Sequence, residues 1–411
     1  MRTETAMRER KVFGEDAPLF SFGILSYNNY CYITETLDSL FKQDYPNIEL
    51  LISNDGSEDF DEQELIDYIA NNKRENIKRV FVNNNAENIG TVQNINLVRQ
   101  QARGEYIMYM AADDALYDET VLSRYVEEFE RLGRNAMLVC SKTAMCSHDL
   151  EDMRCTAPDK AGIEAIKSLS PKQMFSRLSH TFTIPTTSTA YRMSLYEKLG
   201  GYDADYYIME DAPLYIRMAR EGIPFYWIDN MIGARHRDGG ISHGNTLNLG
   251  EGYRRYRYDE ITFFKKEVLP YKNRLQPYDR NKMQEKWEMV QREYDKLFVL
   301  PYLTGYERMQ RRVKHAPQIL WHLIQRFFAQ FLALFLDRNF GNAVLALSVS
   351  SIAFSGLAWF GFSLLHLSGY LQMFFWLFRA GFAAGLIWMA LQLLKIAVSL
   401  LRAVRFVLLG R

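Results

Sequence analysis

The N-terminal half of the chain alternates short apolar runs with stretches in which apolar residues recur every three or four positions. The apolar runs predict buried strands, and they span residues 19–26, 48–53, 78–82, 106–110, 136–140 and 225–228. The periodic stretches predict helices, and they are marked by Ile33, Leu37, Leu40 and Phe41, by Leu65, Ile66 and Ile69, by Val92, Ile95 and Val98, and by residues 118–132. This alternation favours an α/β fold with a mostly parallel sheet covered by helices on both faces.

The pattern weakens after the fifth predicted strand. Residues 147–172 are polar and weakly patterned, and we expect them to form a mobile loop near the site. Apolar spacing predicts further helices at 174–178, after Asp211, at 253–271 and at 281–310.

The C-terminal part of the chain is mostly apolar. Residues 343–366 contain no charged side chain and are long enough to span a bilayer core of about 30 Å. Residues 380–401 form a second candidate span, interrupted only by Lys395, whose long side chain can reach the membrane interface. The helix predicted at 319–336 has one polar face, which suits a position in the membrane interface. The alternative for this helix is packing on the globular part of the protein.

Basic residues flank the two candidate spans. They are Arg311, Arg312 and Lys314 before the first span, and Arg402, Arg405 and Arg411 after the second. Under the positive-inside rule, both ends of a two-span hairpin would then lie in the cytoplasm. An interfacial position of the last helix stays open, because its polar residues share one helical face; they are Gln392, Lys395, Ser399 and Arg402.

Composition argues against some classes of function. The chain has 49 basic and 49 acidic residues and a net charge of zero, whereas a nucleic-acid-binding protein normally has a basic excess. The four cysteines include no Cys-x-x-Cys pair, which favours reduced cytosolic thiols over a disulfide framework or a zinc site; they are Cys31, Cys140, Cys146 and Cys155. Residues 1–18 form a polar tail without an apolar segment, so we predict no signal peptide.

Polar side chains follow three of the predicted strands directly. Tyr27 and Asn28, Asp55, and the pair Asp113–Asp114 stand at these strand ends. The carboxyl ends of parallel strands share one edge of a sheet, so these side chains can converge on one ligand. A carboxylate pair there suits Mg²⁺ or Mn²⁺ bound together with substrate phosphates. The alternatives are ordinary turn chemistry around Asp55 and solvated aspartates at Asp113–Asp114.

Four short motifs accompany these strand ends. They are Ser26-Tyr27-Asn28, Ser53-Asn54-Asp55-Gly56-Ser57, Asn88-Ile89-Gly90 with Asn94, and Gly104-Glu105-Tyr106-Ile107 followed by Asp113-Asp114. In this order and spacing, the segment from Phe20 to about Ser242 resembles an inverting glycosyltransferase of family 2. The resemblance implies the GT-A fold, a Rossmann-like mixed sheet that binds nucleotide-diphosphate sugars.

The resemblance also implies roles for individual residues. Asp55 would contact the nucleotide base, and Asp113 would ligate a divalent metal, magnesium or manganese, on the donor diphosphate. Asp114 and His236 are the further candidate metal ligands. The other candidate donor-binding residues are Ser26, Tyr27, Asn28, Asn88, Gly90, Asn94, Arg235 and Arg237. One departure is Ala111, because the family commonly has an acidic residue two positions before Asp113.

A second acidic pair, Glu210–Asp211, precedes a predicted helix. An acidic residue at this place is normally a helix cap or a partner of the helix dipole. In the family that the chain resembles, however, Gly-Gly-Tyr-Asp followed by Glu-Asp marks the acceptor site. Here these residues are Gly200 to Asp203 and Glu210–Asp211. The resemblance makes Asp211 the general base and Glu210 a supporting residue. A solvated basic loop is the alternative for Arg235, His236 and Arg237.

These observations give a domain layout and a hypothesis for function. We predict a polar tail (1–18), a GT-A catalytic domain (19–250), a helical linker (251–318) and a module of interfacial helix and membrane hairpin (319–411). The expected protein is a hexosyltransferase-type, metal-dependent, inverting glycosyltransferase at the inner membrane, with its catalytic domain facing the cytoplasm. It would use a nucleotide-diphosphate sugar, first of all a UDP-sugar, and a lipid-linked or glycan acceptor of the cell envelope.

The sequence leaves other functions open. One is a catalytically silent scaffold protein that binds nucleotide sugars at the membrane, and Ala111 is its support. A nucleotidyltransferase is disfavoured, because no glycine-rich, lysine-containing phosphate loop lies near the N-terminus. The Gln-x-x-Arg-Trp motif of processive synthases is absent from the sequence, which favours single transfer. The oligomeric state stays open, a homo-oligomer included.

Overall fold

The computed structural model describes residues 11–238 and 250–303. The chain divides into two compact units, Met1–Leu297 and Phe298–Arg411, and nearly all described residues belong to the first. The predicted interfacial helix at 319–336 and the two candidate spans lie outside the described residues. Among the helices of the described ranges, none is both long enough and apolar enough to cross a bilayer.

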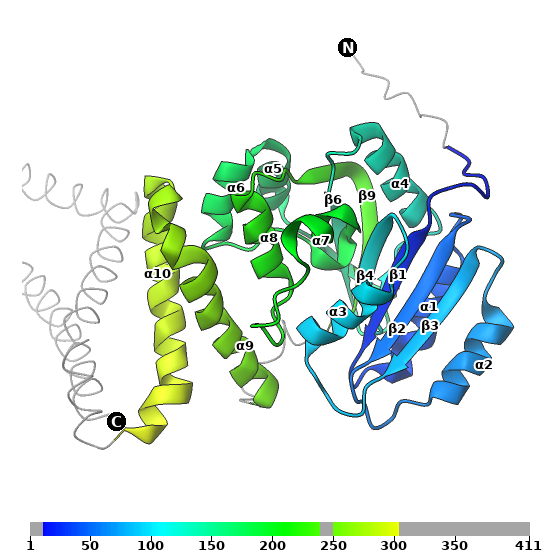
Figure 1. The fold of residues 1–411 in the computed structure, drawn as a ribbon, viewed down its shortest axis with the longest axis horizontal. Coiled ribbons are helices and arrows are strands. Elements are labelled where there is room, and N and C mark those ends of the chain that lie inside the picture. Colours follow the sequence, from blue (N-terminus) through cyan, green and yellow to red (C-terminus); the bar gives the residue numbers. More distant parts are fainter. Residues whose placement is uncertain (1–10, 239–249, 304–411) are drawn as a thin grey trace, which may run out of the picture. The chain divides into compact units, whose positions relative to one another are not determined.

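The core of the first unit is one sheet, in which nine strands of the described residues take part. Its order is β3-β2-β1-β4-β8-β6-β9-β5, and β7 pairs with β6. The first four strands in this order are parallel neighbours and lie side by side in Figure 1. They are β1 (Phe20–Ser26), β2 (Ile48–Asn54), β3 (Ile77–Asn84) and β4 (Tyr106–Ala111). The sequence prediction of a parallel sheet is confirmed for this half.

The second half of the sheet is mixed. Its strands are β5 (Ala115–Leu116), β6 (Leu138–Cys146), β7 (Met153–Ala157), β8 (Thr189–Arg192) and β9 (Tyr226–His236). β8 runs antiparallel to both β4 and β6, whereas β6 and β9 are parallel. The mixed sheet agrees with the GT-A expectation.

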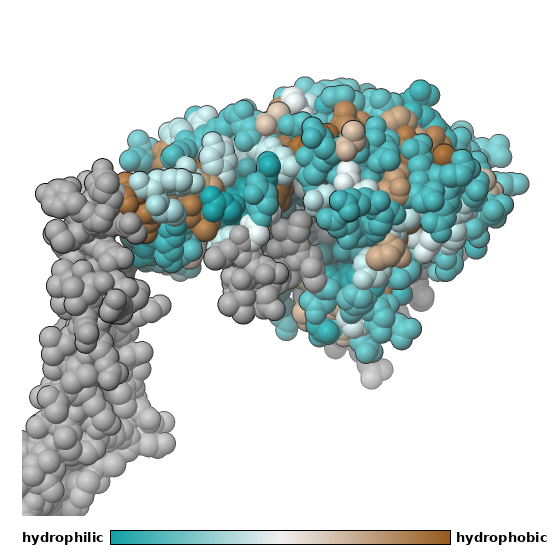
Figure 2. Space-filling model, turned by 90° about the horizontal axis from the view of Figure 1, so that it is seen from below, coloured by the Kyte–Doolittle hydropathy of each residue, from teal (hydrophilic) through white to brown (hydrophobic). Residues whose placement is uncertain are grey.

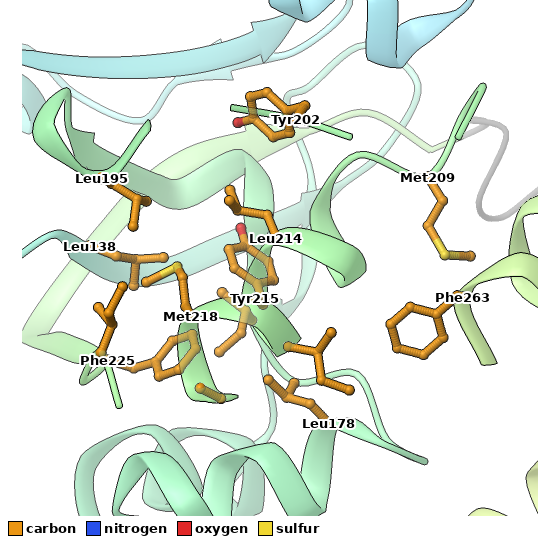
Figure 3. Packing of buried hydrophobic residues seen from close by; sticks show 14 of the residues in the cluster. Leu138, Leu178, Leu195, Tyr202, Met209, Leu214, Tyr215, Met218, Phe225 and Phe263 are labelled. Carbon is orange, nitrogen blue, oxygen red and sulfur yellow. The ribbon is translucent and has the colours of Figure 1, made fainter. Parts of the chain in front are cut away.

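Helices cover both faces of the sheet. They are α1 (Ile33–Phe41), α2 (Glu62–Asn72), α3 (Thr91–Gln101), α4 (Val121–Leu132), α5 (Lys160–Ser168), α6 (Pro171–Leu178), α7 (Ser194–Leu199), α8 (Asp211–Arg220), α9 (Glu251–Phe263) and α10 (Pro277–Tyr294). Apolar residues of α1, α2 and α4 share one core cluster with one face of the central strands. The cluster on the opposite face takes residues from α3 and from α5 to α10, and part of it is drawn in Figure 3.

Helices α9 and α10 belong to this compact unit. Ile261, Phe263, Met283 and Val290 are buried in the same cluster as α8. Short π and 3₁₀ turns continue the two helices, over Phe264–Val268 and Leu269–Arg274 and over Asp295–Val299 and Leu300–Tyr302. The part of the outer surface seen in Figure 2 is mostly hydrophilic, with apolar residues scattered among polar ones.

Two sequence predictions were wrong in this region. The segment 147–172 is not a loop, because it contains β7, α5 and the start of α6. β7 is an edge strand whose residues are exposed or half-buried, so its sequence has no apolar alternation, and the side chain of Asp159 caps α5. The strand predicted at 225–228 continues to His236. Exposed Asp229 and Asn230 interrupt its apolar pattern, so the sequence signal stops too early.

Candidate active site

Three strand ends meet at the carboxyl edge of the sheet, as the sequence predicts. β1 lies between β2 and β4, and Ser26 is opposite Asn54 in the register. The Asp55 N–H donates to the Ser26 carbonyl (2.8 Å), and the Ala112 N–H donates to the Leu25 carbonyl (2.9 Å). The order of connections reverses at β1, and open α/β sheets bind ligands at such switch points.

Asp55 is 3% exposed and holds the loop that follows β3. Its Oδ1 accepts hydrogen bonds from the Ile89 N–H (2.9 Å) and the Asn85 side chain (3.1 Å), and its Oδ2 accepts one from the Gly90 N–H (3.0 Å). A carboxylate has about four acceptor positions, and these protein groups occupy three of those of Asp55. The predicted contact of Asp55 with the base stays a prediction.

Gly90, Asn88 and Asn94 maintain this same loop. Gly90 has φ +93°, and a Cβ there would lie 2.7 Å from the Tyr207 carbonyl oxygen. The Asn88 Oδ1 accepts from the Gly90 N–H (3.0 Å) and from the Tyr207 hydroxyl (2.5 Å). Asn94 is buried, and its Oδ1 accepts from the Ser53 hydroxyl (2.5 Å). Their contacts with a donor stay predictions.

The loop after β1 connects the first strand end to Asp113. The Asn29 side chain accepts from the Ser26 hydroxyl (3.1 Å), and its amide donates to the Asp113 Oδ1 (3.0 Å). Asn28 has φ +55°, and its N–H donates to the Ser57 hydroxyl (2.9 Å). Tyr27 is 43% exposed at this edge, and its contact with a donor stays a prediction. The sequence analysis missed Asn29, although it directly follows the Tyr27-Asn28 motif.

Asp113 and Asp114 differ in their surroundings. Asp113 is half-buried at the edge, whereas Asp114 is 2% exposed and faces the protein. The Asp114 carboxylate accepts from the Arg237 N–H (3.1 Å), and the His236 Nδ1 lies 3.0 Å from each of its oxygens. Burial raises the pKa of Asp114, and the hydrogen bond with His236 opposes that shift. The Asp114 carboxylate therefore faces His236, and its predicted role as a metal ligand stays a prediction.

The two arginines of this region already bind protein groups. The Arg237 guanidinium is buried and donates to the Asp113 carbonyl (2.9 Å), to the His148 carbonyl and to the Glu35 carboxylate (2.7 Å). Arg235 donates to the Tyr117 carbonyl (3.2 Å) from within β9. In this conformation Arg237 connects α1 with the turns after β4 and β6. The predicted diphosphate contacts of both arginines stay predictions. Because Arg235 and His236 end a strand, the solvated-loop alternative does not hold for them.

The second acidic pair stands at the beginning of α8. Glu210 occupies the N-cap position, but its side chain makes no capping hydrogen bond. The Asp211 Oδ2 accepts from the Thr186 hydroxyl (2.9 Å), and its Oδ1 accepts from the Ala212 N–H (2.6 Å). The geometry thus disfavours the helix-cap alternative for Glu210.

Desolvation changes the acidity of this pair. Burial raises the pKa of Glu210 well above its ordinary value, and the charge of Asp211 adds to the shift. Burial also raises the pKa of Asp211, against the opposing effect of the Thr186 hydrogen bond. A carboxylate with a raised pKa is the more effective proton acceptor near neutral pH.

The N-terminal part of the chain is similar to known proteins. Residues 21–200 match the model described as glycosyl transferase family 2. This part of the chain is therefore similar to family 2 glycosyltransferases. The match includes Asp55, Asp113 and Asp114, whereas Asp211 and His236 lie beyond it.

Curated relatives give the same class. The chain is 24% identical over 204 residues to an uncharacterized glycosyltransferase of Rickettsia prowazekii, which covers 50% of this chain and 59% of that protein. It is 28% identical over 209 residues to the uncharacterized glycosyltransferase EpsJ of Bacillus subtilis, 50% of this chain and 57% of that protein. The similarity thus spans little more than half the length of these relatives.

Two solved structures are also similar to this chain. One is TarS 1–349 of S. aureus in complex with UDP-GlcNAc, at 16% identity and a TM-score of 0.48, covering 73% of this chain and 80% of that chain. The other is the mannosyltransferase PcManGT from Pyrobaculum calidifontis in complex with GDP-Man and Mn²⁺, at 15% identity and a TM-score of 0.47, covering 84% and 90%.

Proposed function

We propose that the chain is a glycosyltransferase that moves a sugar from a nucleotide-diphosphate donor to an acceptor hydroxyl, with inversion at the anomeric carbon. One observation carries the proposal. A half-buried carboxylate, Asp113, stands at the switch point of a domain similar to family 2 glycosyltransferases, beside a histidine that Asp114 orients. This arrangement suits a donor diphosphate together with a divalent metal.

The residues present fit such a metal. Among the residues that the structure describes, no group of three or more His, Cys, Asp or Glu side chains forms a complete metal cage. Mg²⁺ and Mn²⁺ at phosphate sites need no such cage, because one or two protein ligands act together with substrate phosphates. Asp113 supplies a carboxylate. A histidine whose Nδ1 faces a carboxylate is the usual form of a histidine metal ligand, which then binds through Nε2.

Asp113 and His236 would hold the metal, and Asp114 would fix the orientation of the imidazole. When bound, the metal supplies Lewis-acid stabilisation for the charge of the departing nucleoside diphosphate. Tyr27 offers an exposed ring for the base, and the loop held by Asp55 borders the nucleotide. A UDP-sugar is the first donor to test.

Asp211 is the proposed general base. A sugar hydroxyl is a poor nucleophile, so a positioned carboxylate must accept its proton as the new bond forms. The Thr186 hydroxyl fixes one oxygen of Asp211. Displacement assisted by one base inverts the anomeric carbon without a covalent sugar–enzyme intermediate.

We further propose that residues 319–411 attach the protein to the cytoplasmic face of the inner membrane. Their apolar sequence supports this, through the uncharged run at 343–366 and the candidate span at 380–401. A membrane position favours a lipid-linked acceptor, such as a polyprenyl-diphosphate glycan. Deleting 343–411 should release the protein from membranes; a truncated protein that still sediments with them would place the attachment upstream.

The first test is thermal stability of detergent-purified protein with UDP, GDP, CDP or dTDP, each with and without Mn²⁺. A ligand that binds only the folded state raises the melting temperature. We expect a metal-dependent rise for one nucleotide, and loss of sugar transfer but not of binding in Asp211→Asn. Nucleotide binding without any turnover of donor sugars by the wild type would favour the silent scaffold. The absence of a shift with every nucleotide would contradict the donor site.

A further inference from the structure

Asp259 is a buried carboxylate that the sequence analysis did not single out. It lies on α9, well beyond the residues of the family match, and is 1% exposed. Its Oδ2 accepts hydrogen bonds from three consecutive backbone N–H groups, those of Tyr207 (3.0 Å), Ile208 (2.6 Å) and Met209 (2.9 Å). Its Oδ1 accepts a second bond from Tyr207 (3.1 Å). These residues directly precede Glu210 and Asp211.

The segment 204–210 has no helix or strand of its own. Without regular secondary structure, its backbone N–H groups need other acceptors. The Asp259 carboxylate is the acceptor for the N–H groups of residues 207–209. These N–H groups in turn compensate the cost of burying its charge. Two more contacts join the segment to α9. The Arg255 guanidinium carbon lies 3.8 Å from the centre of the Tyr207 ring, and Met209 points toward Phe263 within the same core cluster (Figure 3).

The other side of the same segment contacts the loop after β3 that Asp55 holds, which we call the donor loop. The Tyr207 hydroxyl lies within hydrogen-bond distance of the Asn88 carbonyl (3.0 Å) and Oδ1 (2.5 Å), and the Tyr207 carbonyl accepts from the Val92 N–H (3.1 Å). Gly90 leaves the space that the Tyr207 ring fills. Residues 207–209 are thus held between α9 and the loop that Asp55 fixes.

We propose that Asp259 is a positioning residue of the acceptor site, which acts through the backbone of residues 207–209 to set Asp211 against the donor loop. The inference rests on the proposed role of Asp211 as base. A displacement of about 1 Å at a reacting group can lower the rate by roughly 100-fold. The three N–H groups that Asp259 holds immediately before the base are therefore placed to control turnover.

Glu260, the next residue on α9, provides a matched control. It is also buried, but its carboxylate pairs with Arg257 on the same helix and with Lys286 of α10 (3.1 Å). Glu260→Gln removes a buried charge from α9 and weakens its packing with α10, without touching residues 207–209. A loss of activity that comes only from loosening α9 would occur in both variants.

The test compares Asp259→Asn and Glu260→Gln with the wild type in the full-length protein. We expect Asp259→Asn to lower kcat for sugar transfer by roughly 10- to 100-fold. The donor KM and the nucleotide-dependent rise in melting temperature should stay at wild-type values. Backbone amide exchange should become faster at residues 207–209 in Asp259→Asn and stay unchanged there in Glu260→Gln.

Equal losses of kcat in the two variants, or unchanged amide protection at 207–209 in Asp259→Asn, would overturn the inference. The exchange measurement does not depend on turnover. The two failures can therefore be distinguished. If the proposed function is wrong, the wild-type protein transfers no sugar, but amide exchange at residues 207–209 still becomes faster in Asp259→Asn.

Discussion

The Nδ1 atom of His236 lies 3.0 Å from each carboxylate oxygen of Asp114. This contact joins the end of β9 to the turn after β4, 122 residues earlier in the chain. It directs Nδ1 into the protein, so Nε2 is the ring nitrogen on the opposite side. The carboxylate of adjacent, half-buried Asp113 accepts a hydrogen bond from the Asn29 amide. The two aspartates therefore have different surroundings, which agrees with the different roles that we propose for them.

Asp113→Asn and Asp114→Asn should weaken metal binding by different amounts. Loss of the proposed ligand in Asp113→Asn should abolish the Mn²⁺-dependent part of nucleotide binding. Loss of the residue that orients His236 should cost about 10- to 100-fold in metal affinity, the usual effect of removing such a partner. The measurement is a Mn²⁺ titration of the nucleotide-induced rise in melting temperature.

Asp118→Asn is the control for this comparison. Asp118 lies in the next turn, after β5, and its carboxylate accepts from the Thr120 N–H (2.8 Å). It should need no more Mn²⁺ than the wild type. If Asp114→Asn needed no more Mn²⁺ than the wild type, Asp114 would not orient a metal ligand. If nucleotide binding by Asp113→Asn still depended fully on Mn²⁺, Asp113 would not belong to the metal site.

Much of the parallel half of the sheet, with its candidate donor-binding residues, could be predicted from the sequence, because the signals are local. Apolar runs that end in Ser26, Asn54 and Ala111 define parallel strands, and parallel strands bring their carboxyl ends together. The partners of the site residues could not be predicted in this way. The Arg237 guanidinium pairs with Glu35, which lies 202 residues away, and Asp259 binds backbone N–H groups that no side-chain motif reveals.

Asp55→Ala should reduce both stability and nucleotide affinity. It removes the acceptor of the Ile89 N–H, whereas the Gly90 N–H keeps its bond to Asn88 and the Asn85 amide its bond to Asn94. The cost should be about 1–3 kcal/mol in the free energy of unfolding. The freed loop should then bind nucleotide more weakly. Urea unfolding and nucleotide titration measure the two effects.

Asp159→Ala separates these effects from a general loss of stability. The Asp159 side chain caps α5 by accepting from the Gly162 N–H (2.8 Å), and losing such a cap costs about 1 kcal/mol. Nucleotide affinity should not change in this variant. If Asp55→Ala lost stability but bound nucleotide as the wild type does, its loop would not belong to the donor site.

Glu210→Gln should stabilise the protein at neutral and higher pH. Burial, with the charges of Asp211 and Asp259, raises the pKa of Glu210 well above its ordinary value. The folded protein thus binds this proton more tightly than the unfolded chain. The resulting stability is present below the unfolded pKa, about 4.3, and is lost as the pH rises through the folded pKa.

The glutamine side chain is neutral at every pH, so the variant avoids that loss. Its melting temperature should exceed that of the wild type at pH 7 to 8, and the difference should shrink toward pH 4. A difference that does not vary with pH would show that the ionisation of Glu210 has no part in it.

In the pH profile of kcat, Thr186→Val should move the loss of activity on the acidic side to a higher pH. Burial raises the pKa of Asp211, and the hydrogen bond from the Thr186 hydroxyl opposes the shift by favouring the charged carboxylate. Without this bond, the pKa of Asp211 rises further. A general base acts in its deprotonated form, so activity should then be lost at a higher pH during acidification.

Thr186→Ser is the matched control, because it keeps the hydroxyl and loses only a methyl group. Its loss of activity on the acidic side should stay at the wild-type pH. An overall loss of kcat in Thr186→Val with the acidic side of the profile unmoved would mean that the hydroxyl supports packing alone. The Tyr215 hydroxyl donates to the same Thr186 oxygen (3.3 Å), so Tyr215→Phe tests whether the tyrosine adds to the effect. A smaller shift in the same direction is expected there, because Tyr215 reaches Asp211 only through Thr186.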